Sequence, residues 1–420
     1  MRRTLVLTGW MLMTGGAWGA NISASLETKF QVDNRFNASP RFLGELWGDA
    51  EILSTQSDWR AHFSWAGRLS SLSDDSGGKL YQAFVEKHWK FLQSAVRLGR
   101  FQRADLSGLY FLDGGQLDYR IGDWRMQWYG GRPMRADNVR SLEGDSVHGV
   151  RLGYDRTVHR RWGALTWERY RFNAEYQAFR NNGLSRRLQG AASLQGRIGD
   201  RRSWESTLTA TYRFDRARFE DVWFSGFVDL TATLRFRTHY EYYRPRSPFP
   251  SFRERFTSAY ALEEQSLFRA ELHHRPTARL HYFIGGQRAT KADGFDGFGI
   301  RGGGDYRWRD STFALTWDYL EIGADRAHSG YARIVQAIDS RLEIWANAAV
   351  RREEKLLYGV NWARGGETGF RFLLDGNWVI LTSLSYIANS RRKDDYVGAV
   401  RVIYYLDRFQ PKGKTCAWLC

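Results

Sequence analysis

Alternation of apolar and polar side chains between Ile22 and Asp33 is the feature that most constrains the fold of this chain. The even positions carry Ile, Ala, Leu, Thr, Phe and Val, and the odd positions carry only polar side chains. Successive side chains of a β-strand point to opposite faces, so this strand has one apolar and one polar face. The pattern recurs along nearly the whole chain, as in Trp59–Ser70, Trp204–Phe214 and Trp378–Ala388. A barrel with lipid outside and water inside needs such strands throughout.

The N-terminal residues predict export. Two arginines follow Met1, an apolar run extends from Leu5 to Met13, and small residues at Ala17 and Gly19 precede Ala20. This order is typical of a signal peptide over residues 1–19, and we expect Sec export. No later segment offers about 18 consecutive apolar residues, so we expect no transmembrane helix. An exported chain that crosses a membrane only as strands must close into a barrel, which indicates the outer membrane of a Gram-negative bacterium.

Composition agrees with a membrane barrel. Mean hydropathy is only −0.53, because alternation hides the lipid face in the average. Aromatic residues make up 15% of the chain, which suits aromatic girdles at the two membrane interfaces. The net charge is +16, carried mostly by arginine, but the cations alternate along strands and form no basic helix or arm. We therefore expect no nucleic-acid partner.

The strand-like segments predict a single all-β domain, an antiparallel transmembrane β-barrel over residues 20–407 followed by a tail at 408–420. We count about 22 strands, and 18 or 20 are also compatible with the pattern. Short turn signals such as Gly122-Asp123 separate neighbouring strands, while 102–114, 132–145 and 244–258 read as longer connections. The first strand follows the predicted cleavage site directly, so we expect no N-terminal plug.

Arginine dominates the polar parity of the predicted strands. A lumen lined by Arg side chains favours anionic solutes. Two alternatives stay open: a wall whose arginines are paired with Asp and Glu, and arginines near the rims that contact lipopolysaccharide phosphates. The pore-lining candidates are Arg60, Arg68, Arg97, Arg120, Arg125, Arg197, Arg213, Arg235, Arg237 and Arg401.

The segment Arg97-Leu-Gly-Arg100 followed by Gln102–Gln116, with its acids and glycines, resembles the early third of many bacterial porin-like outer-membrane proteins. In porins an early loop folds into the barrel and narrows it. The resemblance implies that Asp105 and Asp113 belong to a constriction loop and face a cluster of Arg97, Arg120 and Arg125. An ordinary surface loop is the alternative.

The remaining residue patterns do not predict a catalytic or cofactor-binding site. We find no nucleophile motif and no haem-attachment motif, and we expect no catalysis, cofactor or metal. His273 and His274 are adjacent, so they point to opposite faces of a strand and cannot chelate together with His281. The only cysteines are Cys416 and Cys420. They could form a short disulfide or bond a partner, or the tail has no role.

The sequence therefore predicts a porin-like channel for passive diffusion of small hydrophilic, preferentially anionic solutes. A barrel of about 22 strands has a wide lumen. The alternative function is a sheath that holds a lumen-filling partner, such as a multihaem cytochrome in an electron conduit. Outer-membrane lipid, lipopolysaccharide and two further copies of the chain in a trimer are the other expected partners.

Overall fold

The computed structural model describes residues 20–406 except for the connections 35–40, 55–56, 72–76, 106–107, 136–144, 181–183, 200–201, 244–264, 292–295, 323–324, 354–361 and 391–394. The predicted signal peptide, Cys416, Cys420 and the long connection at 244–258 lie outside the described residues, and they stay predictions.

The described chain consists of strands joined by turns, with one short 3-10 helix, η3, at Phe214–Arg216. The strands are β1 (Ala20–Asp33), β2 (Arg41–Ser54), β3 (Trp59–Ser70), β4 (Gly77–Trp89), β5 (Ser94–Asp105), β6 (Gly108–Ile121), β7 (Trp124–Arg135), β8 (Ser146–Trp162), β9 (Leu165–Arg180), β10 (Leu184–Ile198), β11 (Arg202–Arg213), β12 (Arg218–Asp229), β13 (Leu234–Tyr243), β14 (Gln265–His274), β15 (Leu280–Lys291), β16 (Asp296–Trp308), β17 (Ser311–Ile322), β18 (Asp325–Ala337), β19 (Leu342–Glu353), β20 (Trp362–Leu373), β21 (Trp378–Asn389) and β22 (Asp395–Tyr405).

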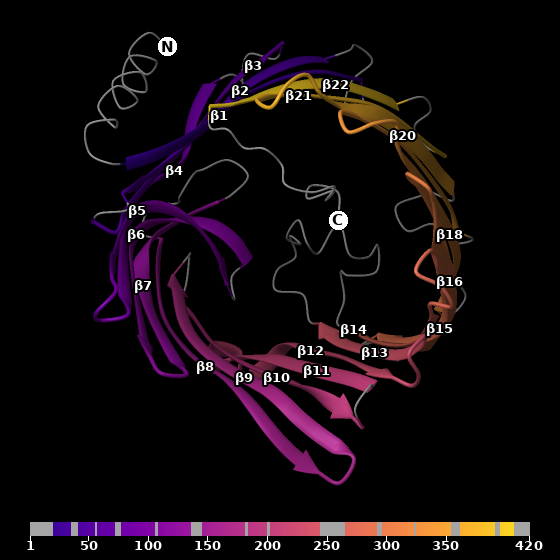
Figure 1. The fold of residues 1–420 in the computed structure, drawn as a ribbon, viewed down its shortest axis with the longest axis horizontal. Coiled ribbons are helices and arrows are strands. Elements are labelled where there is room, and N and C mark those ends of the chain that lie inside the picture. The colour runs from indigo at the N-terminus through magenta and orange to yellow at the C-terminus, as the bar shows by residue number, and fades with distance from the viewer. Residues whose placement is uncertain are drawn as a thin grey trace.

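Each strand pairs antiparallel with its sequence neighbours, and β1 pairs with β22 to close a 22-stranded barrel (Figure 1). At the closing seam Lys29 lies opposite Arg401 in register. Closure leaves no free sheet edge there, as a spanning sheet requires. The prediction of a single antiparallel barrel of about 22 strands is confirmed. No helix in the described part of the chain is long and apolar enough to span a membrane.

The two faces of the wall differ as the alternation predicts. The outward parity carries large apolar side chains that remain widely exposed, among them Phe30 at 64% and Leu98 at 60%. The opposite parity carries ion pairs such as Arg68–Glu45 and Arg401–Glu27, at 2.7 and 2.8 Å. Exposed apolar side chains in a continuous band are the surface that lipid covers.

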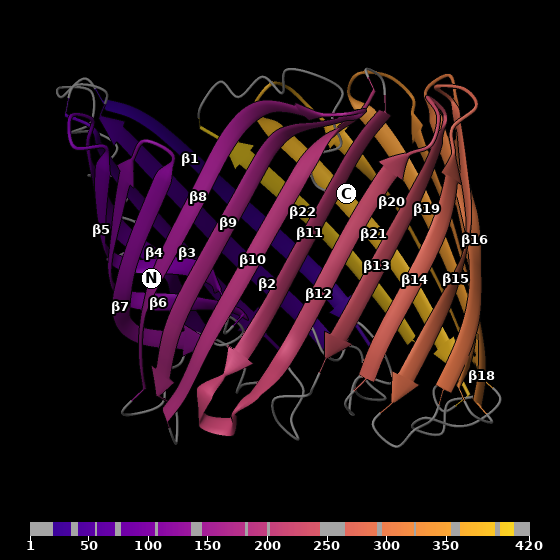
Figure 2. The ribbon, with the colours of Figure 1, turned by 90° about the horizontal axis from the view of Figure 1, so that it is seen from below.

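The two ends of the barrel have different connections (Figure 2). At one end every turn is short, as at Gly122-Asp123 between β6 and β7. Several of these turns are capped by a side chain: the Asp339 carboxylate accepts hydrogen bonds from the backbone N–H groups of Arg341 and Leu342 at 2.6 and 2.7 Å. The other end has the longest connections, including 244–264. In outer-membrane barrels the short turns face the periplasm and the longer loops the outside.

Candidate functional site

Part of strands β5, β6 and β7 leaves the barrel wall. β5 pairs with β4 only from Ser94 to Arg100, and β7 pairs with β8 only from Trp124 to Gly131. Beyond these points the three strands pair only with one another. We call the segments 101–105, 108–113 and 132–135 the inward flap, because these strands curl from the wall toward the interior in Figure 1.

A row of glycines forms the bend at the base of the flap. Gly99, Gly114 and Gly131 are opposite one another in register across β5, β6 and β7. A Cβ atom on Gly114 would lie 2.1 Å from the Gly130 carbonyl oxygen, and one on Gly131 would lie 2.3 Å from that of Asp113. Gly99 has φ +118°, which side chains rarely adopt. Only glycine allows the backbones to approach this closely, and a glycine kink is how a sheet turns a sharp corner.

One face of the flap packs against the wall at β2 to β4. Phe111 and Met134 are buried in a small cluster with Tyr81 of β4. The rings of Phe111 and Tyr81 meet edge to face at 5.7 Å, and Tyr81 stacks on Trp47 of β2 at 5.0 Å. Phe111 and Met134 thus pack inside the barrel, although their parity would point them to lipid in an unbent wall.

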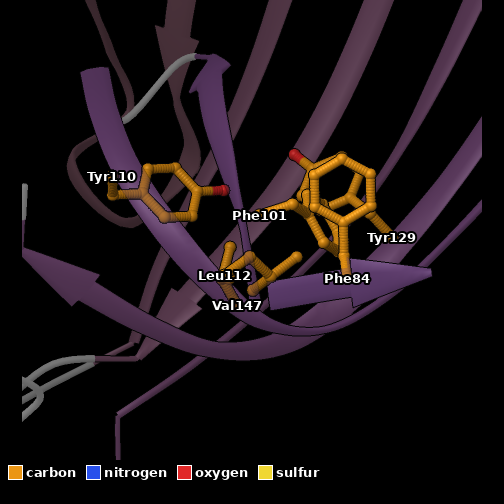
Figure 3. Close-up of a cluster of buried hydrophobic side chains, with 6 residues drawn as sticks. All are labelled: Phe84, Phe101, Tyr110, Leu112, Tyr129 and Val147. Atoms are coloured by element: carbon orange, nitrogen blue, oxygen red, sulfur yellow. The ribbon is translucent and has the colours of Figure 1, made fainter. Parts of the chain in front are cut away.

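The other face of the flap forms the main buried cluster of the described residues (Figure 3). Phe101 and Leu112 are fully buried, and Val147 of β8 is nearly so. The Tyr110 ring contacts Phe179 of β9 at 6.4 Å, edge to face. The cluster also includes Phe84 and Tyr129. Contacts from β6 to β9 bridge two intervening strands, which requires the flap to fold over the interior face of the wall.

Arg103 is the polar anchor of the flap. Its guanidinium donates to Asp105 at 2.8 Å, to Gln116 at 2.9 Å and to Glu175 of β9 at 3.3 Å. It also lies over the Tyr129 ring, 3.2 Å from the ring centroid. Glu175 in turn accepts from the Tyr129 hydroxyl at 2.7 Å and pairs with Arg151 at 2.7 Å. All of these side chains except that of Arg151 are buried yet hydrogen-bonded, which is the condition under which buried charge is tolerated.

Side chains satisfy backbone groups where β5 leaves β4. The Gln102 backbone N–H donates to the Gln82 side-chain oxygen at 3.3 Å. Arg100 donates to the Leu80 carbonyl at 2.8 Å and also pairs with Asp113 at 2.6 Å. Where the two strands separate, side chains therefore supply hydrogen-bond partners for backbone groups that no longer pair with a neighbouring strand.

The predicted constriction-loop residues lie in the flap, but two details of that prediction are wrong. The segment 102–114 is not a loop, because β5 continues to Asp105 and β6 begins at Gly108. Asp105 pairs with Arg103 and accepts from the Tyr110 hydroxyl, and Asp113 pairs with Arg100. The predicted partners are engaged elsewhere: Arg97 with Glu86, Arg125 with Asp118, and Arg120 with the Gly122 carbonyl. These charged side chains pair with partners on the same or a neighbouring strand, so they do not form the predicted cluster across the loop.

Most of the candidate pore arginines have a carboxylate partner. Eight of the ten are ion-paired: Arg60 with Glu51, Arg68 with Glu45, Arg97 with Glu86, Arg125 with Asp118, Arg197 with Glu168, Arg213 with Asp215 and Glu220, Arg235 with Asp229, and Arg401 with Glu27. Arg120 and Arg237 have no carboxylate within ion-pair distance among the described residues. Both are exposed.

The histidines separate as adjacent strand residues must. His274 bonds to the Tyr282 hydroxyl at 2.6 Å, whereas His273 lies on the other face, where its Nδ1 is 3.0 Å from Nε2 of His281. His273 also contacts Glu271 at 2.9 Å, and His281 contacts Asp305 at 2.8 Å. Within the described ranges no group of three His, Cys, Asp or Glu side chains could hold a metal ion.

Sequence reasoning missed the flap itself, and two signals in the sequence could have revealed it. Leu109-Tyr110-Phe111-Leu112 is a continuous apolar run, whereas the rest of its strand, 116–121, alternates. Such a run indicates a strand with both faces buried. The second signal is the recurrence of glycine at Gly99, Gly114 and Gly131, which the hairpin register aligns.

No protein-family model matches the chain, and no curated protein matches it. Among solved structures, the siderophore receptor PirA from Pseudomonas aeruginosa is similar over 92% of this chain and 80% of its own, with 8% identity and a TM-score of 0.57. The Pseudomonas aeruginosa protein OpdQ matches over 92% of this chain and 98% of its own, with 11% identity and a TM-score of 0.46. OpdF from the same organism, in complex with glucuronate, matches over 92% and 97%, with 13% identity and a TM-score of 0.43. The likeness to PirA confirms the fold, a large closed barrel of the Gram-negative outer-membrane type.

Proposed function

We propose that the protein is an outer-membrane channel for passive diffusion of small hydrophilic solutes, with a preference for anions. The observation that carries this proposal is the inward flap. It is fastened on both faces, to Tyr81 of β4 and to Glu175 of β9. A fixed element inside a wide barrel sets the width of the passage without needing any catalytic residue.

The preference for anions rests on the charge of the interior face. Paired arginines contribute little net field, because a carboxylate lies within about 3 Å of most of them. The exposed and unpaired Arg120 and Arg237 are therefore the candidate pore residues with most influence on a passing ion. Cationic groups that line a pore favour anions over cations.

Planar-bilayer recordings of the purified chain test both parts. We expect stable conductance steps, and under a KCl gradient a reversal potential displaced toward that of chloride. The variant Arg237→Gln should reduce this displacement, and Arg401→Gln should reduce it as well, because it leaves the Glu27 carboxylate without its arginine. A reversal potential displaced toward potassium would contradict the anion preference, and an absence of steps would contradict the channel.

The sheath for a multihaem cytochrome is the second candidate, favoured by the size of a 22-stranded barrel. The flap argues against it, because its side chains already fill one sector of the interior. Purification of the barrel from its native membrane distinguishes the channel from the sheath. Haem absorbance that stays with the barrel at constant ratio would support the sheath.

A further inference from the structure

One sector of the outer face carries three arginines and a histidine at the end of the barrel with the longer connections. Arg326 and His328 begin β18, Arg352 lies near the end of β19, and Arg364 lies near the start of β20. We call these four residues the rim cluster. They lie side by side, because His328 is opposite Arg352 and exposed Val350 is opposite Arg364 in register. All four are exposed.

The parity of these residues places them on the lipid side of the wall. Val350, two residues before Arg352, is 59% exposed, and Leu315 on β17 is 62% exposed. Both belong to the outward apolar band. Residues Ala327 and Arg351, which have the opposite parity, lie opposite Leu320 and Ser329 on the interior face.

Aromatic side chains lie beside the rim cluster, since Tyr319 is opposite His328 and Trp362 is opposite Arg352 in register. Trp317 and Tyr319 stack on β17, and the Tyr319 ring lies 4.8 Å from that of His328. The Arg364 guanidinium lies 5.6 Å from the centre of the Trp362 ring. Tryptophan and tyrosine at the edge of an apolar band mark the depth of the lipid headgroups. The side chains of the rim cluster are therefore level with the headgroups.

Among the side chains that the structure describes, the rim cluster has more arginines than carboxylate partners. Arg326 is 3.4 Å from Glu321, which also accepts from the Tyr319 hydroxyl. Arg352 and Arg364 have no carboxylate partner among the side chains that the structure describes. On the same outer face Arg288, by contrast, pairs with Asp296 at 2.6 Å. Two exposed guanidinium groups level with the headgroups match a phosphate in charge and in hydrogen-bond geometry.

We propose that the rim cluster binds the phosphate groups of a phosphorylated glycolipid in the outer leaflet. The short turns at the opposite end direct this rim to the outside. Arg352 and Arg364 donate forked hydrogen bonds to one phosphate, Arg326 and His328 flank it, and the acyl chains lie along Val350 and Leu315. This site is on the outside of the wall and does not depend on the channel function.

Native mass spectrometry of the full-length barrel in detergent tests the site. The probes are bisphosphorylated lipid A and the same lipid with its phosphates removed. We expect the wild-type chain to retain the phosphorylated lipid preferentially. The double variant Arg352→Gln/Arg364→Gln should bind it about tenfold or more weakly, because two charge-assisted donors are lost.

A matched control carries the same change of charge at the other end, Arg279→Gln/Arg341→Gln, and should bind the lipid as the wild type does. Heat-dependent mobility in gels verifies that each variant is folded. Equal loss in the two double variants would reduce the effect to net charge and overturn the proposal. Equal retention of the two lipids by the wild type would also overturn it.

Discussion

At the scale of single residues, the glycine row is the most sensitive feature of the flap. A Cβ on Gly114 has no room, because the Gly130 oxygen and the Gly131 Cα are backbone atoms and cannot move aside alone. We expect Gly114→Ala to lower the free energy of unfolding by about 1–3 kcal/mol. Gly190→Ala is the matched control, since a Cβ there meets nothing within 4 Å. Urea unfolding in lipid vesicles measures both, and equal unfolding midpoints would show that the bend does not need glycine.

The sequence predicts on which face of the wall each charged side chain lies, but it does not predict which residue that side chain pairs with. Placing Arg60, Arg68 and Arg401 on the polar parity required only the period of a strand. Their carboxylate partners depend on strand register, as Arg401 and Glu27 show across the closing seam. Register between the first and last strands is set by closure of the whole barrel, which a local pattern does not contain.

At the scale of elements, Arg103 holds the flap to β9. Its replacement by methionine keeps an unbranched apolar stem but leaves Asp105 and Glu175 without their shared cation. Losing one partner of a buried charge network costs about 3–5 kcal/mol. We expect Arg103→Met to loosen the flap and to raise the mean conductance and the current noise of single channels.

Arg197→Met is the control for this change. Arg197 pairs with Glu168 at 2.7 Å, but about half of its side chain is exposed, so water can replace the lost contact. Its conductance should stay close to that of the wild type. Unchanged conductance in Arg103→Met would mean that the flap does not limit the current.

The sequence pattern predicts the strands of the flap but not the position of the flap inside the barrel. The hairpin of β5 and β6 has ordinary strand alternation at its base, and there the sequence predicts strands correctly. Past Gly99 and Gly114 both faces are buried, so Phe111 and Leu112 lie next to each other in sequence and pack on opposite sides. Whether an apolar run faces lipid or protein depends on the bend, and the bend is a property of three aligned strands.

At the scale of the whole molecule, barrel closure and strand number follow from features that the sequence repeats many times. Alternation and short turns recur along the chain, and prolines are few throughout. An error in assigning one strand therefore has little effect on the predicted number of strands. The content of the interior does not follow in the same way. It is decided by one local departure, the flap, which also bears on the competing channel and sheath functions.

The pairing of interior arginines leads to a prediction for the molecule as a whole. Near neutral pH eight of the ten candidate arginines are balanced by carboxylates such as Glu45 and Glu86, so we expect only modest anion selectivity. Carboxylates ordinarily titrate near pH 4, whereas arginine stays charged. Acidification protonates carboxylates and histidines and leaves arginine charged, and an arginine partner delays protonation of a carboxylate. The reversal potential under a KCl gradient should therefore move further toward that of chloride as the pH falls from 7 to about 3.

The variant Glu45→Gln should reproduce part of this change at pH 7, because it leaves Arg68 and Lys29 without their carboxylate. Gln31→Asn, on the same interior parity of β1, changes no charge and serves as the control. A reversal potential independent of pH, with intact conductance steps, would show that these ion pairs lie away from the path of the ions. A shift toward potassium on acidification would contradict an interior governed by arginine, since the only charges lost in this range are negative.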